Sequence, residues 1–300
     1  MKQEIAVVII TYNPPETFSD NLFEICKQVD AVLVIDNASE KKHTALLAQL
    51  AQDSKISVIS NSVNLGVATA LNEGFRWAAQ RDFDYVLTLD QDSFPSAGMV
   101  QKLLGVYQAS TESSTIAIVA PRVIDRAVGV ASRYLRPKGR FFFELVDCEH
   151  GLLDDVVFVI TSGSLCNLKA YQAIGSFEDV FFIDYVDVEY CLHARALGYN
   201  IIIACDAILA HSLGAREERS FLGKKEYPRF HSPLRWYYQS RNRILVLRKY
   251  ISQNPFLFFY EGMNLIYGVI RMLAFEDNRL KKIRAMLKGS LHAFIKLQKK

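Results

Sequence analysis

The stretch IAVVIITYN, residues Ile5–Asn13, places six apolar residues directly before a threonine, a tyrosine and an asparagine. Similar runs, rich in valine and isoleucine, follow at Ala31–Ile35, Ile56–Ser60, Tyr85–Leu89 and Ile116–Ala120. Because these runs are continuous rather than alternating, they indicate strands that are covered on both faces. Segments of helical length separate them, at about residues 16–28, 40–52, 67–80 and 96–109. The repeated strand–helix units predict an α/β fold with a mostly parallel central sheet flanked by helices.

The segment after residue 120 is less regular. Val156–Ile160 and Ile201–Ala204 are expected to be strands, and the stretch after Asp184 is expected to be a helix that stops at Gly198. Residues 214–231 are polar with mixed charge, which predicts a mobile loop.

The composition describes a folded protein. The chain has 300 residues, of which 50% are apolar and 22% charged, so disorder, collagen and low-complexity classes are excluded. A net charge of +3 gives no argument for nucleic acid as a partner. The five cysteines are scattered, odd in number and form no CxxC pair, so we expect neither a disulfide framework nor a zinc site, and a reducing compartment fits better. Residues 1–10 are interpreted as the start of a buried strand, not as a targeting segment.

Polar residues follow four of the expected strands. They are Thr11-Tyr12-Asn13, Asp36-Asn37-Ala38-Ser39, Asn61 with Asn64-Leu65-Gly66, and Asp90-Gln91-Asp92-Ser93. In open α/β sheets, ligands bind beyond the carboxyl ends of the strands. Each group alone is explained by helix caps and turns, but all four together indicate a binding site.

Asp90 and Asp92 are separated by one residue at a sharp strand exit, where both carboxylates can face one pocket. Hard divalent cations take such oxygen ligands together with phosphates of the substrate. His211 follows another expected strand and precedes a glycine turn, so it is a candidate further ligand, with a satisfied polar residue as the alternative. We therefore expect a site for Mg²⁺ or Mn²⁺.

Asp184, Asp187 and Glu189 form a second acidic cluster at the start of a helix. Acidic residues at this position are also explained by the helix dipole. The functional interpretation is a general base, because a carboxylate can take the proton of a sugar hydroxyl as it attacks.

These pieces, in this order, resemble the inverting family-2 glycosyltransferases with a GT-A-type fold, and among them the bacterial rhamnosyltransferases that use dTDP-rhamnose. The resemblance covers about residues 5–245. It is carried by VVIITYN (7–13), VIDNAS (34–39), NLGVATALNEG (64–74), LTLDQDS (87–93), TSGSL (161–165), FFIDYVDVEYCLHARALGY (181–199), AHSLG (210–214) and YYQSRN (237–242).

The resemblance implies a role for each matching residue. The donor nucleotide would be bound by Thr11, Asp36, Asn64, Gly66 and Asp90, with Arg241 as a candidate for holding phosphate. Asp92 and His211 would bind the metal and diphosphate, and Asp187 would be the catalytic base. Ser162 and Gly163 would shape the floor for the acceptor and the donor sugar.

The chain departs from the family pattern beside the expected base. Val186 stands where the family has a glutamate, Glu189 stands where an aspartate is commoner, and His193 replaces a usual arginine. Asp184 could substitute for the missing glutamate.

The implied reaction is a single displacement that inverts the anomeric carbon. The sugar would move from a dTDP-sugar, most simply dTDP-L-rhamnose, onto a hydroxyl of a cell-surface polysaccharide, such as O-antigen, or of a lipid-linked precursor. Galactofuranose, glucose and N-acetylhexosamine remain alternative donor sugars. A nucleotidyltransferase is disfavoured because the loop Thr11–Pro15 has no glycine or basic residue. A non-catalytic membrane-binding protein is the last alternative.

The last 60 residues differ in charge from the rest. From Arg241 onward, 13 lysines and arginines face three acidic residues, a local charge of about +10 that leaves about −7 for residues 1–240. We expect a catalytic domain at 1–245 and a helical, basic region at 246–300. Residues 256–275 are long enough to span a bilayer but are interrupted by Glu261, Asn264 and Arg271, so packing on the catalytic domain is preferred.

Residues 277–300 carry apolar side chains at helical spacing among basic residues. They predict an amphipathic helix on an anionic membrane surface, with a solvated helix or a homo-oligomer contact as alternatives. The expected location is cytoplasmic, peripheral on the inner face of the plasma membrane.

Overall fold

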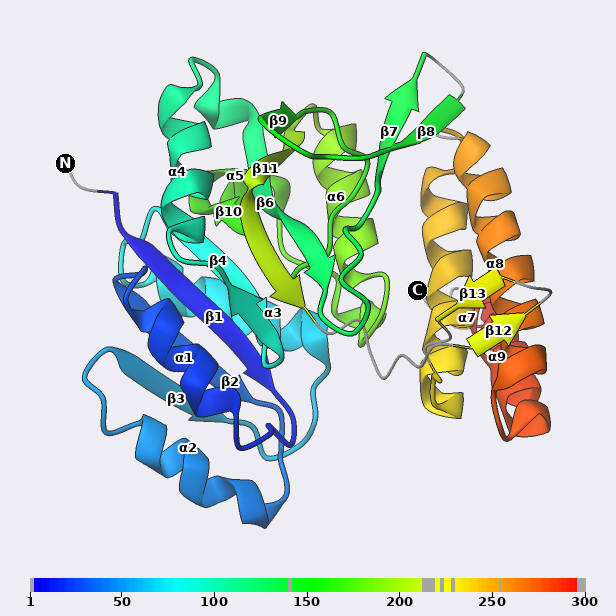
Figure 1. Cartoon of the computed structure of the whole chain (residues 1–300), viewed down its shortest axis with the longest axis horizontal. Helices are drawn as coiled ribbons and strands as arrows, with labels where there is room; N and C mark the ends of the chain where they lie inside the picture. Colours follow the sequence, from blue (N-terminus) through cyan, green and yellow to red (C-terminus); the bar gives the residue numbers. More distant parts are fainter. Residues whose placement is uncertain are drawn as a thin grey trace.

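A mixed sheet lies at the centre of the protein (Figure 1), a computed structural model that describes residues 3–139, 142–211, 219–221, 224–227, 230–253 and 255–295. Its strands are β1 (Ile5–Thr11), β2 (Ala31–Asp36), β3 (Ile56–Ser60), β4 (Tyr85–Asp90), β5 (Ser93–Pro95), β6 (Ile116–Asp125), β9 (Leu152–Leu153), β10 (Leu165–Asn167) and β11 (Asn200–His211). The strand order is β3-β2-β1-β4-β10-β6-β11-β5, and β9 also pairs with β11.

The long strands pair in parallel: β1 with β2 and β4, β2 with β3, and β6 with β11. Three short strands of this sheet are antiparallel to their neighbours. Strand β10 lies between β4 and β6, and β5 and β9 both pair with β11. The prediction of a mostly parallel sheet flanked by helices is confirmed. The antiparallel strands are two or three residues long, too short to give a hydrophobic pattern in the sequence.

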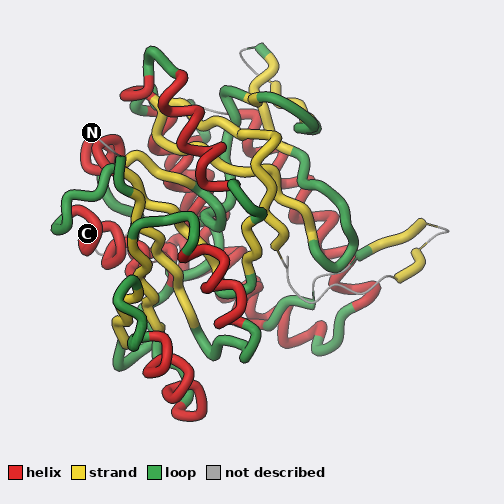
Figure 2. Tube along the Cα trace, turned by 60° about the vertical axis from the view of Figure 1, so that its left-hand side comes forward, coloured by secondary structure: helices red, strands yellow, loops and turns green. Residues whose placement is uncertain are grey.

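Helices cover both faces of the sheet (Figure 2). One hydrophobic core joins the sheet to α1 (Phe18–Cys26), α2 (Thr44–Leu50) and α4 (Met99–Ala109), and the other joins it to α3 (Val67–Ala79), α5 (Leu168–Ile174) and α6 (Val186–Ala196). Val7 and Ile9 point into the first core, whereas Ala6 and Val8 point into the second. This alternation within one apolar run is why the sequence of β1 is continuous rather than patterned. Single turns of 3-10 helix occur at Lys41–His43, Ser113–Thr115 and Asp179–Phe181.

The expected strand at Val156–Ile160 is wrong. This stretch is a buried loop in which the amides of Val156 and Val157 donate to the carbonyls of Ile201 and Leu135, at 3.1 and 2.8 Å. Its valines are buried like those of a strand, and that burial explains the misleading pattern.

The region around the expected helix after Asp184 follows the sequence more closely. Helix α6 ends at Ala196, and Gly198 has a positive φ of 86°, as predicted for a helix stop. Strand β11 extends the expected run to His211. The expected loop at 214–231 is described only in part, because residues 212–218, 222–223 and 228–229 lie outside the described residues. The described part contains the antiparallel pair β12 (Arg219–Phe221) and β13 (Lys224–Glu226).

Cys148 and Cys205 form a disulfide, with a Cα–Cα distance of 5.3 Å. The expectation that the scattered cysteines form no disulfide framework therefore missed one bond. The two cysteines are 57 residues apart in the chain, and only the fold brings them together.

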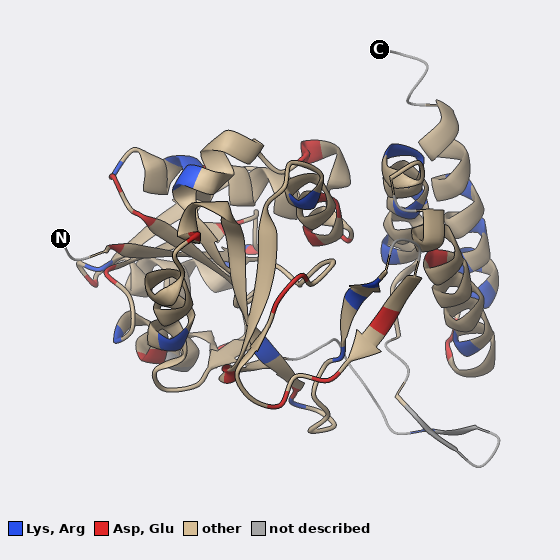
Figure 3. Ribbon diagram, turned by 90° about the horizontal axis from the view of Figure 1, so that it is seen from above, with Lys and Arg blue, Asp and Glu red and all other residues tan. Residues whose placement is uncertain are grey.

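Three helices form the C-terminal part: α7 (Pro233–Tyr250), α8 (Pro255–Phe275) and α9 (Arg279–Ile295). They stand together beside the sheet, and lysines and arginines are distributed along them (Figure 3). The hairpin of β7 (Tyr134–Lys138) and β8 (Phe142–Val146) reaches α8, where the ring of Phe142 lies 5.2 Å from that of Phe256. Residue 245, the expected domain boundary, lies inside α7, and the division into two parts stays a prediction.

Helix α8 is mostly exposed, and the expectation that it is buried against the catalytic domain is wrong. Only 17% of its most apolar window is buried, and among the described residues it is the one helix long and apolar enough to cross a membrane by length and composition. Its exposed apolar residues recur at helical spacing: Phe259, Met263, Ile266, Ile270 and Leu273. Its buried residues include the charged Glu261.

Candidate active site

The carboxyl ends of β1, β2 and β4 meet at one edge of the sheet. In the parallel register, Thr11 lies beside Asp36 and Ile10 lies beside Asp90. The polar residues that follow these strands in the sequence are therefore brought together in space, as expected for an open α/β sheet.

A cavity of about 500 Å³ opens at this edge. Many of the residues singled out from the sequence line it, including Thr11, Asn64, Gly66, Asp90, Asp92, Asp187 and His211. They come from five separate parts of the chain. A volume in this range is typical of a small-molecule site.

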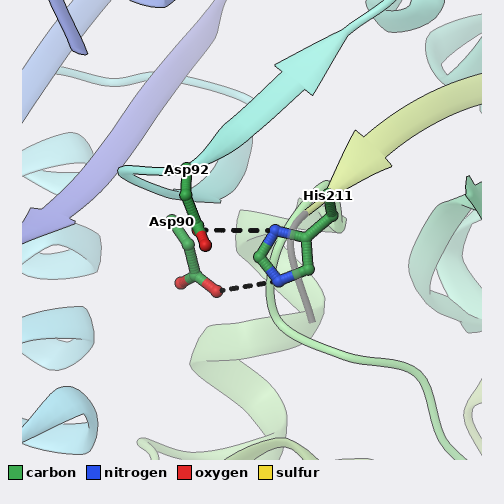
Figure 4. A group of neighbouring side chains, drawn as sticks. All are labelled: Asp90, Asp92 and His211. Atoms are coloured by element: carbon green, nitrogen blue, oxygen red, sulfur yellow. Dashed lines mark ion pairs between the residues drawn. The ribbon is translucent and has the colours of Figure 1, made fainter. Parts of the chain in front are cut away.

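Asp90, Asp92 and His211 point toward one another at the end of β4 and β11 (Figure 4). The Nε2 atom of His211 lies 3.6 Å from Oδ2 of Asp90, and its Nδ1 atom lies 3.5 Å from Oδ1 of Asp92. The antiparallel pairing of β5 with β11 sets this geometry, because it places Ser93 opposite His211. The hydroxyl of Ser93 lies 3.0 Å from Nδ1 of His211.

This group fits a divalent cation. One ligand atom from each of Asp90, Asp92 and His211 lies within 4.8 Å of the others. Two carboxylates and an imidazole match the donor set of Mn²⁺, and the carboxylates also suit Mg²⁺. Burial raises the pKa of Asp90, while His211 lowers it and Asp92 raises it. A cation would favour the charged form of both carboxylates.

Asp187 lies in the first turn of α6 and faces the same cavity. Burial raises the pKa of Asp187 to about 6, against the opposing effect of a hydrogen bond from the amide of Val188 at 2.9 Å. The carboxylates of Asp184 and Asp90 are smaller causes of the same rise in pKa. A carboxylate with a pKa near 6 is charged at neutral pH and is a better proton acceptor than an ordinary aspartate.

The turn before Asp187 is strained and held in place by α7. Asp184 and Tyr185 are consecutive non-glycine residues with positive φ angles of 60° and 66°. The side-chain amide of Asn242 donates to the carbonyls of Ile183 and Asp184, at 2.9 and 2.8 Å. The guanidinium of Arg235 forms an ion pair with Asp184 through contacts of 3.0 and 3.1 Å. Asp184 thus contacts Arg235, and its expected role as a substitute for the missing glutamate stays a prediction.

Gly66 is required by its backbone and by its surroundings. Its φ is +84°, and an added Cβ would lie 2.5 Å from the ring of Phe182. Asn64 supports this turn by accepting the amide hydrogen of Gly66 at 2.9 Å.

Asp36 is placed near the cavity but does not line it. Its carboxylate is buried and accepts hydrogen bonds from the hydroxyl of Thr11, at 3.0 Å, and from the amide of Ser39, at 2.9 Å. Its neighbour Asn37 lines the cavity instead. The side chain of Asn37 donates to the carbonyl of Gly66 at 3.1 Å, which joins the end of β2 to the turn before α3.

Ser162 and Gly163 lie behind the cavity, whose lining includes their neighbour Thr161. The hydroxyl of Ser162 accepts the amide hydrogen of Asp90 at 3.1 Å, and the amide of Gly163 donates to Thr88 at 2.7 Å. Both residues therefore contact the strand that carries Asp90.

Arg241 does not line the cavity. It is buried and donates to the carbonyl of Val180 and to the side chain of Asn242. Because Arg241 is buried and lies outside the cavity lining, the geometry does not favour it as the residue that holds phosphate. Arg235 is the arginine that lines the cavity. The sequence around Arg235 did not indicate this position, because its partner Asp184 is 51 residues away in the chain.

Glu189, the third member of the acidic cluster, has a structural position. It is buried and forms an ion pair with Lys249 at 2.5 Å and a hydrogen bond with the hydroxyl of Tyr250 at 2.7 Å. These contacts attach α6 to α7.

The sequence profile described as "Glycosyl transferase family 2" matches residues 6–175, which include β1 to β4, β6 and β10 and the Asp90–Asp92 pair. The chain is 29% identical to a dTDP-rhamnosyl transferase, RfbF, of Shigella flexneri, over 97% of this chain and 95% of that protein. It is 24% identical to the low-salt glycan biosynthesis hexosyltransferase Agl10 of Haloferax volcanii, over 97% and 91% of the two chains.

The fold also has solved counterparts. The mannosyltransferase PcManGT from Pyrobaculum calidifontis, solved in complex with GDP-Man and Mn²⁺, aligns over 100% of this chain and 88% of its own. The TM-score is 0.56 at 12% identity, a likeness that concerns the fold alone.

Proposed function

The chain belongs to glycosyl transferase family 2 and is a glycosyltransferase. On this premise we propose that it transfers L-rhamnose from dTDP-rhamnose with inversion of configuration. The proposed acceptor is a hydroxyl of a cell-surface polysaccharide or of its lipid-linked precursor. One observation carries the proposal: Asp187 faces the same cavity as Asp90, Asp92 and His211. A proton acceptor for the attacking hydroxyl and a cation site for the departing diphosphate would thus lie in one cavity. The choice of sugar rests on the dTDP-rhamnosyl transferase of Shigella flexneri.

In the proposed site, the donor nucleotide contacts Thr11, Asn64 and Gly66 at the ends of β1 and α3. Asp90, Asp92 and His211 would hold Mn²⁺ or Mg²⁺, which when bound neutralises the charge of a departing diphosphate. Arg235 lines the same cavity and would add a positive charge toward the phosphates.

Asp187 is the proposed general base. It accepts the proton of the acceptor hydroxyl while the hydroxyl oxygen attacks the anomeric carbon from the face opposite the nucleotide. Because the carboxylate only moves a proton and forms no covalent bond to the sugar, the configuration inverts. The ion pair of Arg235 with Asp184 and the hydrogen bonds from Asn242 orient the turn that carries Asp187.

A binding screen with different nucleotide sugars tests rhamnose against the other donor sugars. A ligand that binds only the folded state raises its stability by about 2.7 kcal/mol at a hundredfold excess over its dissociation constant. Thermal unfolding with Mn²⁺ should therefore respond most to dTDP-rhamnose in a panel of dTDP-, UDP- and GDP-sugars. A larger response to a galactofuranose, glucose or N-acetylhexosamine donor would replace rhamnose and leave the family assignment unchanged.

The stereochemistry is tested separately. The anomeric configuration of the product, read by NMR, should be opposite to that of the donor. Retention would contradict the single displacement.

We also propose that the protein works at the inner face of the plasma membrane. The exposed apolar row of α8 supports this location, because contiguous apolar patches on soluble surfaces mark contact sites. The basic residues of α9 would favour anionic lipids. The disulfide between Cys148 and Cys205 is typical of an oxidising compartment, so trapping of free thiols in cell extracts tests the proposed location. At the inner face of the membrane both cysteines should be thiols, and an intact disulfide in the cell would contradict this location.

Removal of α9 is a poor test of membrane contact, because α9 packs closely on α7. An added Cβ at Gly289 would lie 2.2 Å from the carbonyl oxygen of Tyr237. A homo-oligomer through the C-terminal helices is the alternative use of the same surface, and light scattering in the absence of lipid distinguishes it.

A further inference from the structure

A second cavity, of about 550 Å³, lies between α7, α8 and the turn before α6. Its lining includes Trp236 and Gln239 from α7 and Asn264, Tyr267 and Gly268 from α8. Its volume also falls in the range of small-molecule sites.

The polarity of α8 explains why this cavity exists. Glu261, Asn264, Gly268 and Arg271 follow one another at intervals of three, four and three residues, so they share one face of the helix. The apolar row of α8 lies on the other side and is exposed. Helix α8 therefore turns its polar face toward the protein, and three of these four residues line the cavity.

The two cavities are neighbours. Asp184 and His231 line both of them, and Asp184 precedes the proposed base, Asp187, by three residues. A molecule in the second cavity would therefore lie beside the turn that carries the proposed base.

The chemistry of the two cavities differs. Among the described residues, the group of Asp90, Asp92 and His211 is the one that could hold a metal ion, and it belongs to the first cavity. The second cavity combines the edge of the buried Trp236 ring, the ring of Tyr267 and the side-chain amides of Gln239 and Asn264. Charged side chains line it as well, namely those of Asp184, Arg243, Arg271 and Glu276, and these can also form hydrogen bonds with hydroxyls. Aromatic faces pack on the C–H face of a sugar ring, and amides can both donate to and accept from its hydroxyls.

We infer that the second cavity, between α7 and α8, binds the terminal sugar of the acceptor. This inference rests on the proposed function, because a glycosyltransferase needs a place for a second saccharide next to its base. Gly268 keeps the cavity open. An added Cβ there would lie 3.5 Å from the ring of Trp236, which is ordinary contact, so a larger side chain enters the cavity without a backbone clash.

A tryptophan in the wall of the cavity can serve as a fluorescence probe of binding. The chain has two tryptophans, Trp77 in α3 and Trp236 in the cavity wall. In the variant Trp77→Phe, the fluorescence of the protein reports on Trp236 alone. The protein, saturated with dTDP and Mn²⁺, is titrated with methyl glycosides of L-rhamnose, D-glucose, D-galactose and N-acetyl-D-glucosamine.

Two matched variants locate the response. Gly268→Leu fills the cavity, whereas Gly262→Leu introduces the same residue into the same helix at a position with nothing within 4 Å. We expect at least one glycoside to give a saturable change, Gly268→Leu to weaken its binding at least about tenfold, and Gly262→Leu to leave it within about twofold. Hydrolysis of dTDP-rhamnose without acceptor should be unchanged in both variants.

Each outcome has a separate meaning. The inference is overturned if no glycoside changes the fluorescence, or if Gly268→Leu binds the active glycoside as well as Gly262→Leu does. Failure of every nucleotide sugar to bind would instead reject the proposed function. Donor hydrolysis without any response to glycosides would reject the acceptor cavity alone.

Discussion

Replacement of Asp187 by asparagine should slow the enzyme and, at the same time, stabilise it. The asparagine keeps the size of the side chain and an oxygen that can accept the amide hydrogen of Val188. It cannot accept the proton of the attacking hydroxyl. Loss of a general base typically lowers turnover by about 10²–10⁴-fold, whereas binding of dTDP-rhamnose should change little.

The stability change follows from the pKa of Asp187. Burial raises this pKa from 3.8 to about 6, so the folded protein holds the proton more tightly than the unfolded chain does. The contribution of the protonated Asp187 to the free energy of unfolding is fully present below pH 3.8 and is lost as the pH rises through 6. At about 1.4 kcal/mol per pKa unit, the charged carboxylate costs up to about 3 kcal/mol at pH 8. The neutral asparagine removes this cost.

Urea unfolding at pH 4 and pH 8, together with hydrolysis of dTDP-rhamnose, measures both effects. The variant should be more stable than the wild type at pH 8 by up to about 3 kcal/mol and nearly equal to it at pH 4. Asp154→Asn is the control, because Asp154 is exposed and pairs with Arg136 at 2.9 Å, and it should change stability by less than about 1 kcal/mol. Normal turnover of Asp187→Asn, or lower stability at pH 8, would refute the reasoning.

Four further predictions concern other parts of the protein. Asp92→Asn should weaken the Mn²⁺-dependent part of dTDP-rhamnose binding and leave the binding measured with EDTA unchanged, as calorimetry can show, because only one carboxylate of the metal group is lost. Gly66→Ala should reduce both donor affinity and thermal stability, since its Cβ would lie 2.5 Å from Phe182; a normal melting temperature would contradict this. Asn242→Ala leaves the half-buried carbonyls of Ile183 and Asp184 without their donor and should cost about 1 kcal/mol in urea unfolding while lowering turnover more than donor affinity. Ile266→Asp, on the exposed face of α8, should abolish sedimentation with anionic liposomes without changing donor hydrolysis; unchanged sedimentation would exclude α8 as the membrane contact.

The C-terminal helices connect the candidate site to the rest of the chain. Asn242 and Arg235 of α7 hold the turn before Asp187, while the hydroxyl of Tyr185 and the guanidinium of Arg243 both donate to Glu261 of α8, at 2.5 and 2.9 Å. A shift of α8 would therefore be transmitted to Tyr185, two residues before the proposed base. These hydrogen bonds would link the proposed membrane contact of α8 to the proposed base.

The sequence alone determined the long parallel strands of the sheet and much of the candidate site. The five apolar runs in the first 120 residues and the run Ile201–Ala204 predicted these strands, because strands covered on both faces need continuous apolar sequence. Their carboxyl ends identified Thr11, Asn64, Asp90 and Asp92, since parallel strands end at one edge. These features depend on local pattern and on a general rule of topology.

The tertiary structure decided what depends on contacts between distant residues. The register of β5 on β11 brings His211 to Asp92, the ion pair with Asp184 places Arg235 in the cavity instead of Arg241, and the buried loop at 156–160 imitates a strand. The polar face of α8 was visible in the sequence as three interruptions of an apolar run. Its direction toward the protein was not, because the spacing of residues along a helix defines its faces but not the neighbour that each face meets.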